Sequence, residues 1–444
     1  MLKTGFASAT VGCVLLLLPV SLPQEAHAQP ARVSVARDGS VADRGSYQAA
    51  ISGDGRYVAF RSNATNLVEG DTNGVSDVFV RDTRTGVTER VSVDTDGSEF
   101  NDGSFAPSIS DDGRFVAFQT NHSFTGSKYG GYNYAKIIVR DRETGTTIHV
   151  LPVAGISRDP PDRSARLEPA ISGNGRFVAF HTYVNPSTSE PPSTRPPADD
   201  LNRAFDVYVY DLQSQTTERV SRDSHGAEGN GDSFSPSLSD DGTLVAFYSY
   251  ASNLVLNDTN DAEDVFVKNR STGVTTRASV ADDGTQGNDD SYEPCISGNG
   301  RYVVFRSLAD NLVPGDTNGA WDIFVRDLQA GTTERVSVAT DGTQANADSY
   351  GPSISDDGRY VVFRSNATNL VEGDTNDRWD IFLHDRQTGV TTRINLAPGE
   401  ADNHSYAPVI SGDGRFAAFE SDATNLVPGD ANGARDVFLV PLGE

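Results

Sequence analysis

The stretch YGPSISDDGRYVVFRSNATNLVEGDTNDRWDIFLHD, residues Tyr350 to Asp385, decides the fold because the chain contains seven versions of it. The serine of its Ile-Ser-Asp-Asp-Gly-Arg phrase recurs at intervals of 56 to 67 residues, at Ser52, Ser110, Ser172, Ser239, Ser297, Ser355 and Ser411. A period of that size, built from short β-type runs, is typical of an array of small sheets. Each such sheet is too small to bury a core alone and must pack against its neighbours.

Four strands are expected within this unit. The runs 352–355, 360–363, 380–385 and 390–395 are short segments rich in β-branched and aromatic residues. Between the first two, Asp356-Asp357-Gly358 predicts a tight hairpin turn, since glycine readily adopts positive φ. Helical periodicity is absent from the sequence. Four antiparallel strands per repeat, repeated radially, predict an all-β fold: a seven-bladed β-propeller of four-stranded antiparallel blades.

The two ends of the chain predict how the ring closes. The last repeat stops after a third strand, Asp436 to Val440, and lacks a fourth. A spare fourth-strand segment, Arg32 to Val35, precedes the first repeat and matches Arg90 to Val93. Pairing of Arg32–Val35 with Val437–Val440 completes the seventh blade and removes an open sheet edge. We therefore expect a single propeller domain of seven repeats over residues 29–444.

The N-terminus and the charge limit where the protein works and what it binds. Residues 1–28 have the features of a secretory signal peptide, with Lys3, an apolar run from Val11 to Pro23 and an Ala26-His27-Ala28 cleavage site. Cleavage after Ala28 predicts a secreted or periplasmic protein without a membrane span. The net charge of −26 disfavours nucleic acid and anionic membranes as partners. We expect an acidic monomer that binds a protein or carbohydrate ligand.

The phrase Pro-x-Ile-Ser-x-Asp-Gly-Arg-[Tyr/Phe]-Val-[Ala/Val]-Phe resembles the propeller repeat of TolB-like proteins, also called the WD40-like or PD40 repeat. The resemblance covers essentially the whole mature chain and implies a propeller used as a binding platform. The repeats are longer than is usual in that family. The α/β domain that precedes the propeller in TolB is not found, nor is a following hydrolase domain with a Gly-x-Ser-x-Gly motif. A role in the Tol envelope system is therefore not indicated.

The loop between the second and third strands carries the most regular chemistry. Copies of Asp-x-Asn-x-x-x-Asp place oxygen ligands at alternate positions and a carboxylate at the start of a strand, which suits a hard cation such as Ca2+. Two of them begin with Glu69 or Glu372 and resemble the calcium loops of integrin-type propellers. The alternative interpretation is that these residues form Asx turns without metal. The predicted metal ligands are Glu69, Asp71, Asn73 and Asp77; Asp258, Asn260 and Asp264; Asp316, Asn318 and Asp322; Glu372, Asp374, Asn376 and Asp380; and Asp430, Asn432 and Asp436.

Two functions remain open. No histidine has the spacing of a metal site or a catalytic triad, so we favour a non-catalytic binding platform for a protein or glycan, with Ca2+ ordering its long loops. The alternative is a secreted polysaccharide-active, lyase-like enzyme with its site over the second and third blades, where the loops are irregular. Convergence of these side chains in one pocket would favour the enzyme: His122, His181, Tyr129, Tyr132, Tyr134 and Tyr183.

Overall fold

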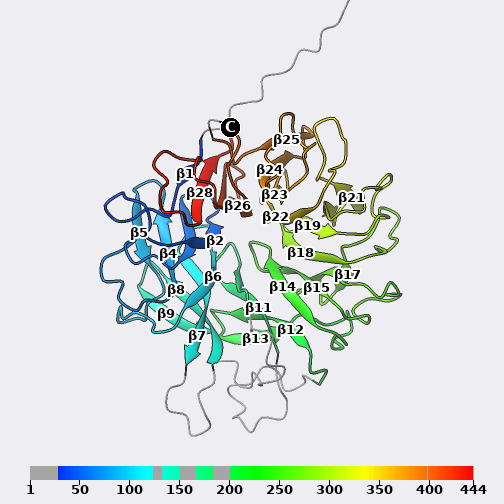
Figure 1. Ribbon diagram of the computed structural model, residues 1–444. Coiled ribbons are helices and arrows are strands. Elements are labelled where there is room, and N and C mark those ends of the chain that lie inside the picture. Colours follow the sequence, from blue (N-terminus) through cyan, green and yellow to red (C-terminus); the bar gives the residue numbers. More distant parts are fainter. Residues whose placement is uncertain (1–28, 124–132, 151–166, 184–200, 398, 444) are drawn as a thin grey trace, which may run out of the picture.

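The computed structural model describes residues 29–123, 133–150, 167–183, 201–397 and 399–443. Its strands form seven four-stranded antiparallel sheets, which are arranged as blades around a central axis (Figure 1). The described residues contain no α-helix, and hence none long and apolar enough to cross a membrane. This architecture confirms the all-β, seven-bladed propeller.

Six blades are each formed by four strands that follow one another along the chain, with the first strand nearest the axis and the fourth at the rim (Figure 1). Blades 1 to 3 contain β2 (Ser46–Ile51), β3 (Tyr57–Ser62), β4 (Asp77–Asp82), β5 (Val87–Arg90); β6 (Ser104–Ile109), β7 (Phe115–Ser123), β8 (Asn133–Asp141), β9 (Thr146–Val150); and β10 (Ala170–Ile171), β11 (Phe177–Tyr183), β12 (Phe205–Asp211), β13 (Thr216–Arg219). Blades 4 to 6 contain β14 (Ser233–Leu238), β15 (Leu244–Ser249), β16 (Asp264–Asn269), β17 (Thr275–Arg277); β18 (Ser291–Ile296), β19 (Tyr302–Ser307), β20 (Asp322–Asp327), β21 (Thr332–Arg335); and β22 (Ser349–Ile354), β23 (Tyr360–Ser365), β24 (Asp380–Asp385), β25 (Val390–Arg393). Blade 7 combines β26 (Ser405–Ile410), β27 (Phe416–Ser421) and β28 (Asp436–Pro441) with the N-terminal β1 (Ala31–Arg32).

The connections leave the blades on two opposite faces. On the loop face, the long connections between second and third strands contact the connections that lead from one blade to the next. The side chain of Asn73 in the first kind of connection, for example, donates to the carbonyl of Phe100 in the second kind. The opposite face, which we call the turn face, carries the short turns between first and second strands.

The apolar core lies between neighbouring blades. Phe60 and Phe79 of blade 1 have no exposed surface, and their ring centroids lie 6.0 Å apart. Val437 and Leu439 of blade 7 belong to the same cluster as Val58 and Phe60 of blade 1. Each blade packs between two neighbours, so both faces of its middle strands are buried. The sequences of these strands are therefore continuous apolar runs and do not alternate between apolar and polar residues.

Each turn on the turn face also packs against the preceding blade. At Gly358 φ is +77°, and a Cβ atom on this residue would lie 2.0 Å from Cδ2 of Tyr302. Glycine satisfies both conditions because it has no Cβ and adopts positive φ without strain. Gly113 meets Tyr57 in the same way. The glycine of the Asp-Gly-Arg phrase is therefore an inter-blade contact as well as a turn residue.

The N-terminal strand closes the ring as predicted, although the strand is Ala31–Arg32 where the sequence predicted Arg32–Val35. β1 pairs antiparallel with β28, and this register places Arg32 opposite Phe438. The amide of Val33 then donates to the carbonyl of Val437 at 2.8 Å. Val33 is itself buried, at 3% exposure, within the core between blades 7 and 1. The edge of β28 is thus covered by the other end of the chain.

Polar side chains reinforce this closure. Ser34 Oγ donates to Asp436 Oδ1 at 2.6 Å, although the two residues are 402 positions apart. The guanidinium of Arg32 pairs with Asp430 at 2.8 Å and with Asp436 at 3.3 Å. The Asp436 side chain has no exposed surface, so both partners compensate a charge that water does not reach.

Replacing Arg32 and Ser34 together by alanine should destabilise the whole ring. The substitution leaves the buried Asp436 carboxylate without its two N-terminal partners, so the free energy of unfolding should fall by about 3 kcal/mol. Deleting residues 29–36 should lower it further, because that also reopens the edge of β28. Calorimetric melting measures both effects. Arg37→Ala is the matched control, since Arg37 is exposed and pairs with Glu69 at the surface. If the deletion variant melts like the parent, the closure is wrong.

Candidate functional site

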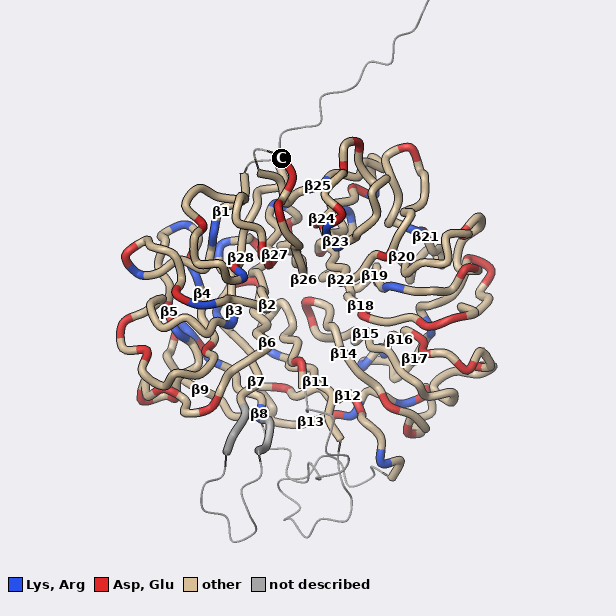
Figure 2. Tube along the Cα trace, viewed as in Figure 1, with Lys and Arg blue, Asp and Glu red and all other residues tan. Residues whose placement is uncertain are grey.

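The predicted metal ligands lie in a network of buried charges on the loop face. In each of the five loops, the asparagine side chain donates to the aspartate that begins the third strand, at 2.8 to 3.1 Å. An arginine from the outer strand also pairs with the first and last aspartates of each loop, at 2.8 to 3.8 Å. Figure 2 shows Lys and Arg segments beside the Asp and Glu segments of the ring. The five arginines are Arg32, Arg90, Arg277, Arg335 and Arg393.

The glutamates at the start of two loops are placed differently. Glu69 pairs with Arg37 at the surface, where the Glu69 side chain is 81% exposed. Glu372 is also exposed. The structure therefore brings together the aspartates and the asparagine of each loop, while these two glutamates face solvent.

Burial changes the acidity of the loop carboxyls. It raises the pKa of Asp71 to about 6, with a further contribution from the neighbouring charge of Asp77 and an opposing one from Arg90. Burial raises the pKa of Asp374 to about 6 for the same reasons. Each loop thus offers oxygen ligands that already have a guanidinium among them. A Ca2+ ion would share the carboxylates with that arginine.

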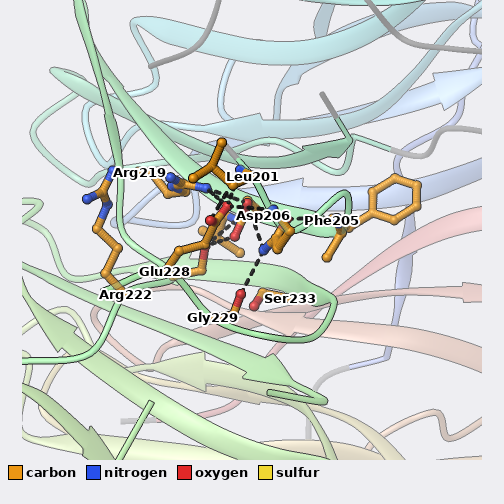
Figure 3. A network of polar contacts seen from close by, with 12 residues as sticks. Leu201, Phe205, Asp206, Arg219, Arg222, Glu228, Gly229 and Ser233 are labelled. Atoms are coloured by element: carbon orange, nitrogen blue, oxygen red, sulfur yellow. Dashed lines mark hydrogen bonds and ion pairs between the residues drawn. The ribbon is translucent and has the colours of Figure 1, made fainter. Parts of the chain in front are cut away.

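A sixth copy of the motif, Asp200-x-Asn202-x-x-x-Asp206, occurs in blade 3, where the proline-rich passage 186–197 obscures the repeat spacing. Asp200 lies outside the described residues. Figure 3 shows Arg219 directed at Asp206 and Glu228, and the Arg219–Asp206 ion pair measures 2.9 Å. Asn202 Nδ2 donates to the Gly229 carbonyl at 2.7 Å. Blade 3 therefore has the same Arg–Asp network as the other five blades.

A second group of side chains, which the sequence did not predict, surrounds the axis at the loop face. Aromatic residues near the start of the first strands contact arginines near the end of the second strands. In blade 4 the second-strand position is taken by Tyr248, and two tryptophans and Arg435 lie just before third strands. The guanidinium carbons lie 3.9 to 5.7 Å from the ring centroids, within the range of cation–π contacts. We call this group the aromatic–arginine belt: Tyr47, Arg61, Phe105, Phe234, Tyr248, Tyr292, Arg306, Trp321, Tyr350, Arg364, Trp379, Tyr406 and Arg435.

A residue with positive φ recurs beside the belt in all seven blades, and in six of them it lies in a bulge of the first strand. The residue before the proline, or before its equivalent in blade 1, has φ between 38° and 59° in all seven blades. These residues are Gln48, Ala106, Glu168, Ser235, Glu293, Gly351 and Ala407. Positive φ strains a residue with a side chain, and bulges redirect the side chains beside them. Repeated strain of this kind next to an aromatic surface motivates the hypothesis that the surface is functional.

Of the two histidines that the lyase-like alternative invokes, the structure describes the side chain of His181. His181 is 5% exposed, and its ring lies 6.2 Å from Phe205 and 5.2 Å from Phe234. An open cavity of about 590 Å3 lies beside them, lined in part by Phe234, Tyr248 and Tyr250. Of the other expected residues, Tyr183 has its ring 5.9 Å from that of Phe205. The side chains of His122, Tyr129, Tyr132 and Tyr134 lie outside the described residues.

Three carboxylates meet at the turn face. Oxygen atoms of Asp111, Asp240 and Asp356 lie within 4.8 Å of one another, and we call them the axial triad. They come from blades 2, 4 and 6. The corresponding residues of the other four blades are glycines: Gly53, Gly173, Gly298 and Gly412. The sequence signal for the triad is the alternation of Ser-Asp-Asp-Gly with Ser-Gly-[Asp/Asn]-Gly. This alternation is lost when all seven phrases are treated as one pattern.

The glycines leave the space that the triad fills. A Cβ atom on Gly173 would lie 2.1 Å from Asp111 Oδ2, and one on Gly298 would lie 2.4 Å from Asp240 Oδ1. Backbone hydrogen bonds join the same positions of neighbouring blades, and the Asp111 amide donates to the Gly173 carbonyl at 3.0 Å. The turns thus form a tight ring around the axis. At the position after the serine, a blade whose neighbour carries an aspartate has room for glycine only.

Burial and mutual repulsion raise the pKa values of the axial triad. Burial comes first and the charge of Asp240 second in raising the pKa of Asp111 to about 6 and that of Asp356 to about 7. The pKa of Asp240 is raised by burial too. Such a group of oxygens can hold a hard cation or share a proton.

Asp356→Asn should stabilise the protein at pH 8 in EDTA. Folding raises the pKa of this carboxyl above that of an unfolded aspartate, near 4, so the folded state binds more protons between about pH 4 and pH 7. Stability therefore falls as pH rises through that window. The variant should gain about 1 kcal/mol at pH 8, after allowance for solvent screening, and almost nothing at pH 4. Urea unfolding at both pH values measures this. Equal gains at the two pH values would contradict the repulsion.

No family model matches the sequence, and no match was found among curated proteins. Solved structures match the fold. An oligogalacturonate lyase from Vibrio parahaemolyticus has a TM-score of 0.54 at 12% identity, covering 94% of this chain and 99% of that chain. The β-propeller domain of the Trilobed protease from Pyrococcus furiosus has a TM-score of 0.52 at 12% identity, covering 90% of this chain and 96% of that chain. A putative TolB from Agrobacterium tumefaciens is 14% identical, with a TM-score of 0.42, over 81% of this chain and 96% of that chain.

These similarities concern the fold alone. The two structures with the higher TM-scores agree with the β-propeller architecture, and a shared fold does not transfer a reaction or a ligand. The Pyrococcus furiosus propeller is described as having an open velcro topology. Here β1 pairs with β28 and closes the ring.

Proposed function

We propose that this protein is an exported, non-catalytic propeller that binds a protein or glycan ligand on the aromatic–arginine belt. The observation that carries the proposal is the continuity of the belt. Ring contacts and cation–π contacts connect Phe234 of blade 4 with Phe105 of blade 2 through blades 5, 6, 7 and 1. The aromatic rings of the belt are half-buried, so part of each is open to a ligand. Tyrosine, tryptophan and arginine are the residues that most often carry binding energy.

The acidity of the tyrosines supports binding over catalysis. Burial raises the pKa of Tyr248, Tyr250 and Tyr292, and nearby carboxylates such as Glu263 raise the last two further. A tyrosine that removes a proton from a substrate needs a pKa near the working pH. These tyrosines are therefore suited to stacking and to donating hydrogen bonds. Export is supported by the signal-peptide features of residues 1–28 and places the belt in a secreted or periplasmic protein.

A ligand on the belt should change the tryptophan fluorescence. The chain has two tryptophans, Trp321 and Trp379, and both belong to the belt. Titration with a panel of neutral and acidic oligosaccharides and of peptides should give a saturable change with at least one of them. Tyr350→Ala should weaken that binding by about tenfold or more, since it removes a central ring. Mass spectrometry should recover the ligand unchanged.

The control is Val274→Ala, in an exposed turn at the rim of blade 4. It should bind like the parent protein. Cleavage of the ligand would favour the lyase-like enzyme. Binding that is unaffected by Tyr350→Ala would contradict the belt as the docking surface.

We also propose that Ca2+ orders the Asp-x-Asn loops, best at residues 69–77 and 372–380. Arg90 lies 3.5 Å from Asp71 and 3.8 Å from Asp77, further than the arginines of the other loops lie from their aspartates. This loop therefore gives a second cation the most room. Arg90→Met removes the competing charge and should tighten calcium binding.

Calorimetry tests the calcium proposal. At a hundredfold excess over the dissociation constant, each occupied site should add about 3 kcal/mol to the stability of EDTA-treated protein. Arg84→Met, at an exposed position on the turn face, is the matched control for Arg90→Met. If Ca2+ moves the melting curve of neither the parent nor Arg90→Met, the loops are Asx turns held by arginine.

A further inference from the structure

We propose that Arg364 is the anion-binding point of the aromatic–arginine belt and that it takes the carboxylate of an acidic sugar residue, such as a uronic acid. This inference rests on the proposed function, because it assumes that the belt is where the ligand docks. It adds the chemical class of the ligand and the side chain that selects it.

Blade 5 has an arginine at this position that is paired with a carboxylate. Arg306 corresponds to Arg364, one blade earlier, and its Nε lies 3.4 Å from Glu293 Oε2. Glu293 is the bulge residue of blade 5, and the same oxygen accepts the amide of Gly351 at 3.0 Å. Blade 5 thus supplies its own carboxylate to its belt arginine.

Blade 6 has the arginine without the carboxylate. The bulge residue that corresponds to Glu293 is Gly351, which has no side chain. The Arg364 guanidinium makes no hydrogen bond or ion pair with any residue in the described ranges, and its Nε is buried without an acceptor. By contrast, Arg435 of blade 7 pairs with Asp422 at 2.9 Å. Arg364 therefore carries a charge that a ligand can compensate.

The surroundings hold this guanidinium in place and leave room beside it. Its carbon lies 5.3 Å from the ring centroid of Trp379, 5.5 Å from that of Tyr350 and 5.7 Å from that of Tyr406. A Cβ atom on Gly351 would have one neighbour within 4 Å, an atom of Pro408 at 4.0 Å. A Cβ atom at position 351 would thus meet no close neighbour, whereas blade 5 carries the Glu293 side chain at the equivalent position. A guanidinium fixed by stacking presents its N–H groups as a fork that matches a carboxylate.

The groups around Arg364 favour a sugar acid over other anions. Tyr350 Oη donates to Asp348 Oδ2 at 3.1 Å, and Tyr292 Oη donates to Asp290 Oδ2 at 3.3 Å. Asp348 and Asp290 accept hydrogen bonds, and the hydroxyl groups of a sugar can donate them. These aspartates therefore fit a ligand that carries hydroxyl groups as well as a single carboxylate. The half-exposed tryptophans beside them offer flat apolar surface to the C–H face of a sugar ring. The peptide C-terminus has the carboxylate without the hydroxyls, and the net charge of −26 opposes a densely charged polyanion.

The test compares three probes on the parent protein: a disaccharide ending in glucuronic acid, the neutral disaccharide of the same linkage, and a short peptide with a free C-terminal carboxylate. Binding is measured by the fluorescence of Trp321 and Trp379 and by calorimetry. The acidic disaccharide should bind about tenfold or more tightly than the neutral one, as expected for a charge-assisted bidentate contact. The peptide should bind more weakly than the acidic disaccharide.

Gly351→Glu gives blade 6 the carboxylate that blade 5 has, and it should abolish the preference for the acidic disaccharide. Glu293 has a φ of 53° at the equivalent position and Gly351 has 59°, so the backbone accepts the change. Gly351→Gln fills the same space without the charge, and the difference between these two variants isolates the charge pairing. Arg364→Gln removes the preference by a second route if Gly351→Glu fails to fold.

The results of these experiments distinguish failure of the Arg364 proposal from failure of the proposed function. Equal binding of the acidic and neutral disaccharides, unchanged by Gly351→Glu, overturns the role of Arg364 and leaves the belt as a docking surface. Binding of the peptide in preference to both sugars overturns the ligand class. A preference for the acidic sugar that survives in both Gly351→Glu and Arg364→Gln places the anion elsewhere and also overturns the proposal. Failure of the proposed function is distinct, since no ligand of the wider panel would then alter the tryptophan fluorescence.

Discussion

A buried aspartate begins the third strand of six blades, and the charge of this residue constrains the rest of the loop face. Asp322 is an example, with no exposed surface. An isolated carboxylate in such a position is destabilising by several kcal/mol, so the chain has to bring donors to it. Asn318 of the preceding loop and Arg335 of the outer strand lie 2.8 and 3.3 Å from it, and Ser337 donates a third hydrogen bond. One charge therefore fixes the loop, the third strand and the outer strand to one another.

Ring closure uses the same interaction across the two ends of the chain. Asp436 takes the place of Asp322, and Ser34 and Arg32 take the places of Ser337 and Arg335. The N-terminal segment is thus an outer strand like the others, separated from its blade in sequence and joined to it by the same partners. Because the described cores are shared between neighbouring blades, opening one junction exposes apolar surface on both sides.

The fold could be predicted from the sequence because its signals are local and repeated. The strands and the Asp-Gly-Arg turn are each encoded within a few consecutive residues, and their repetition gives both the period and the missing fourth strand of the last repeat. The candidate site could be predicted only in part. Asp71 and Asp77 are close in sequence, whereas their partner Arg90 lies on another strand, so the acidic pattern pointed to a cation without showing the arginine. The belt was missed for a similar reason, since Tyr350, Arg364 and Trp379 come from three separate positions of the unit and meet only in the folded blade.

Closure of the ring requires the N-terminal segment to be a full member of the seventh blade. Amide hydrogen exchange, followed by mass spectrometry, measures this directly in the unmodified protein. We expect the segment 31–34 to exchange as slowly as the outer-strand segment 334–337 of blade 5, and both segments to open together with the whole ring. Rapid exchange of 31–34, at the rate of an unstructured chain while the rest of blade 7 stays protected, would contradict the closure.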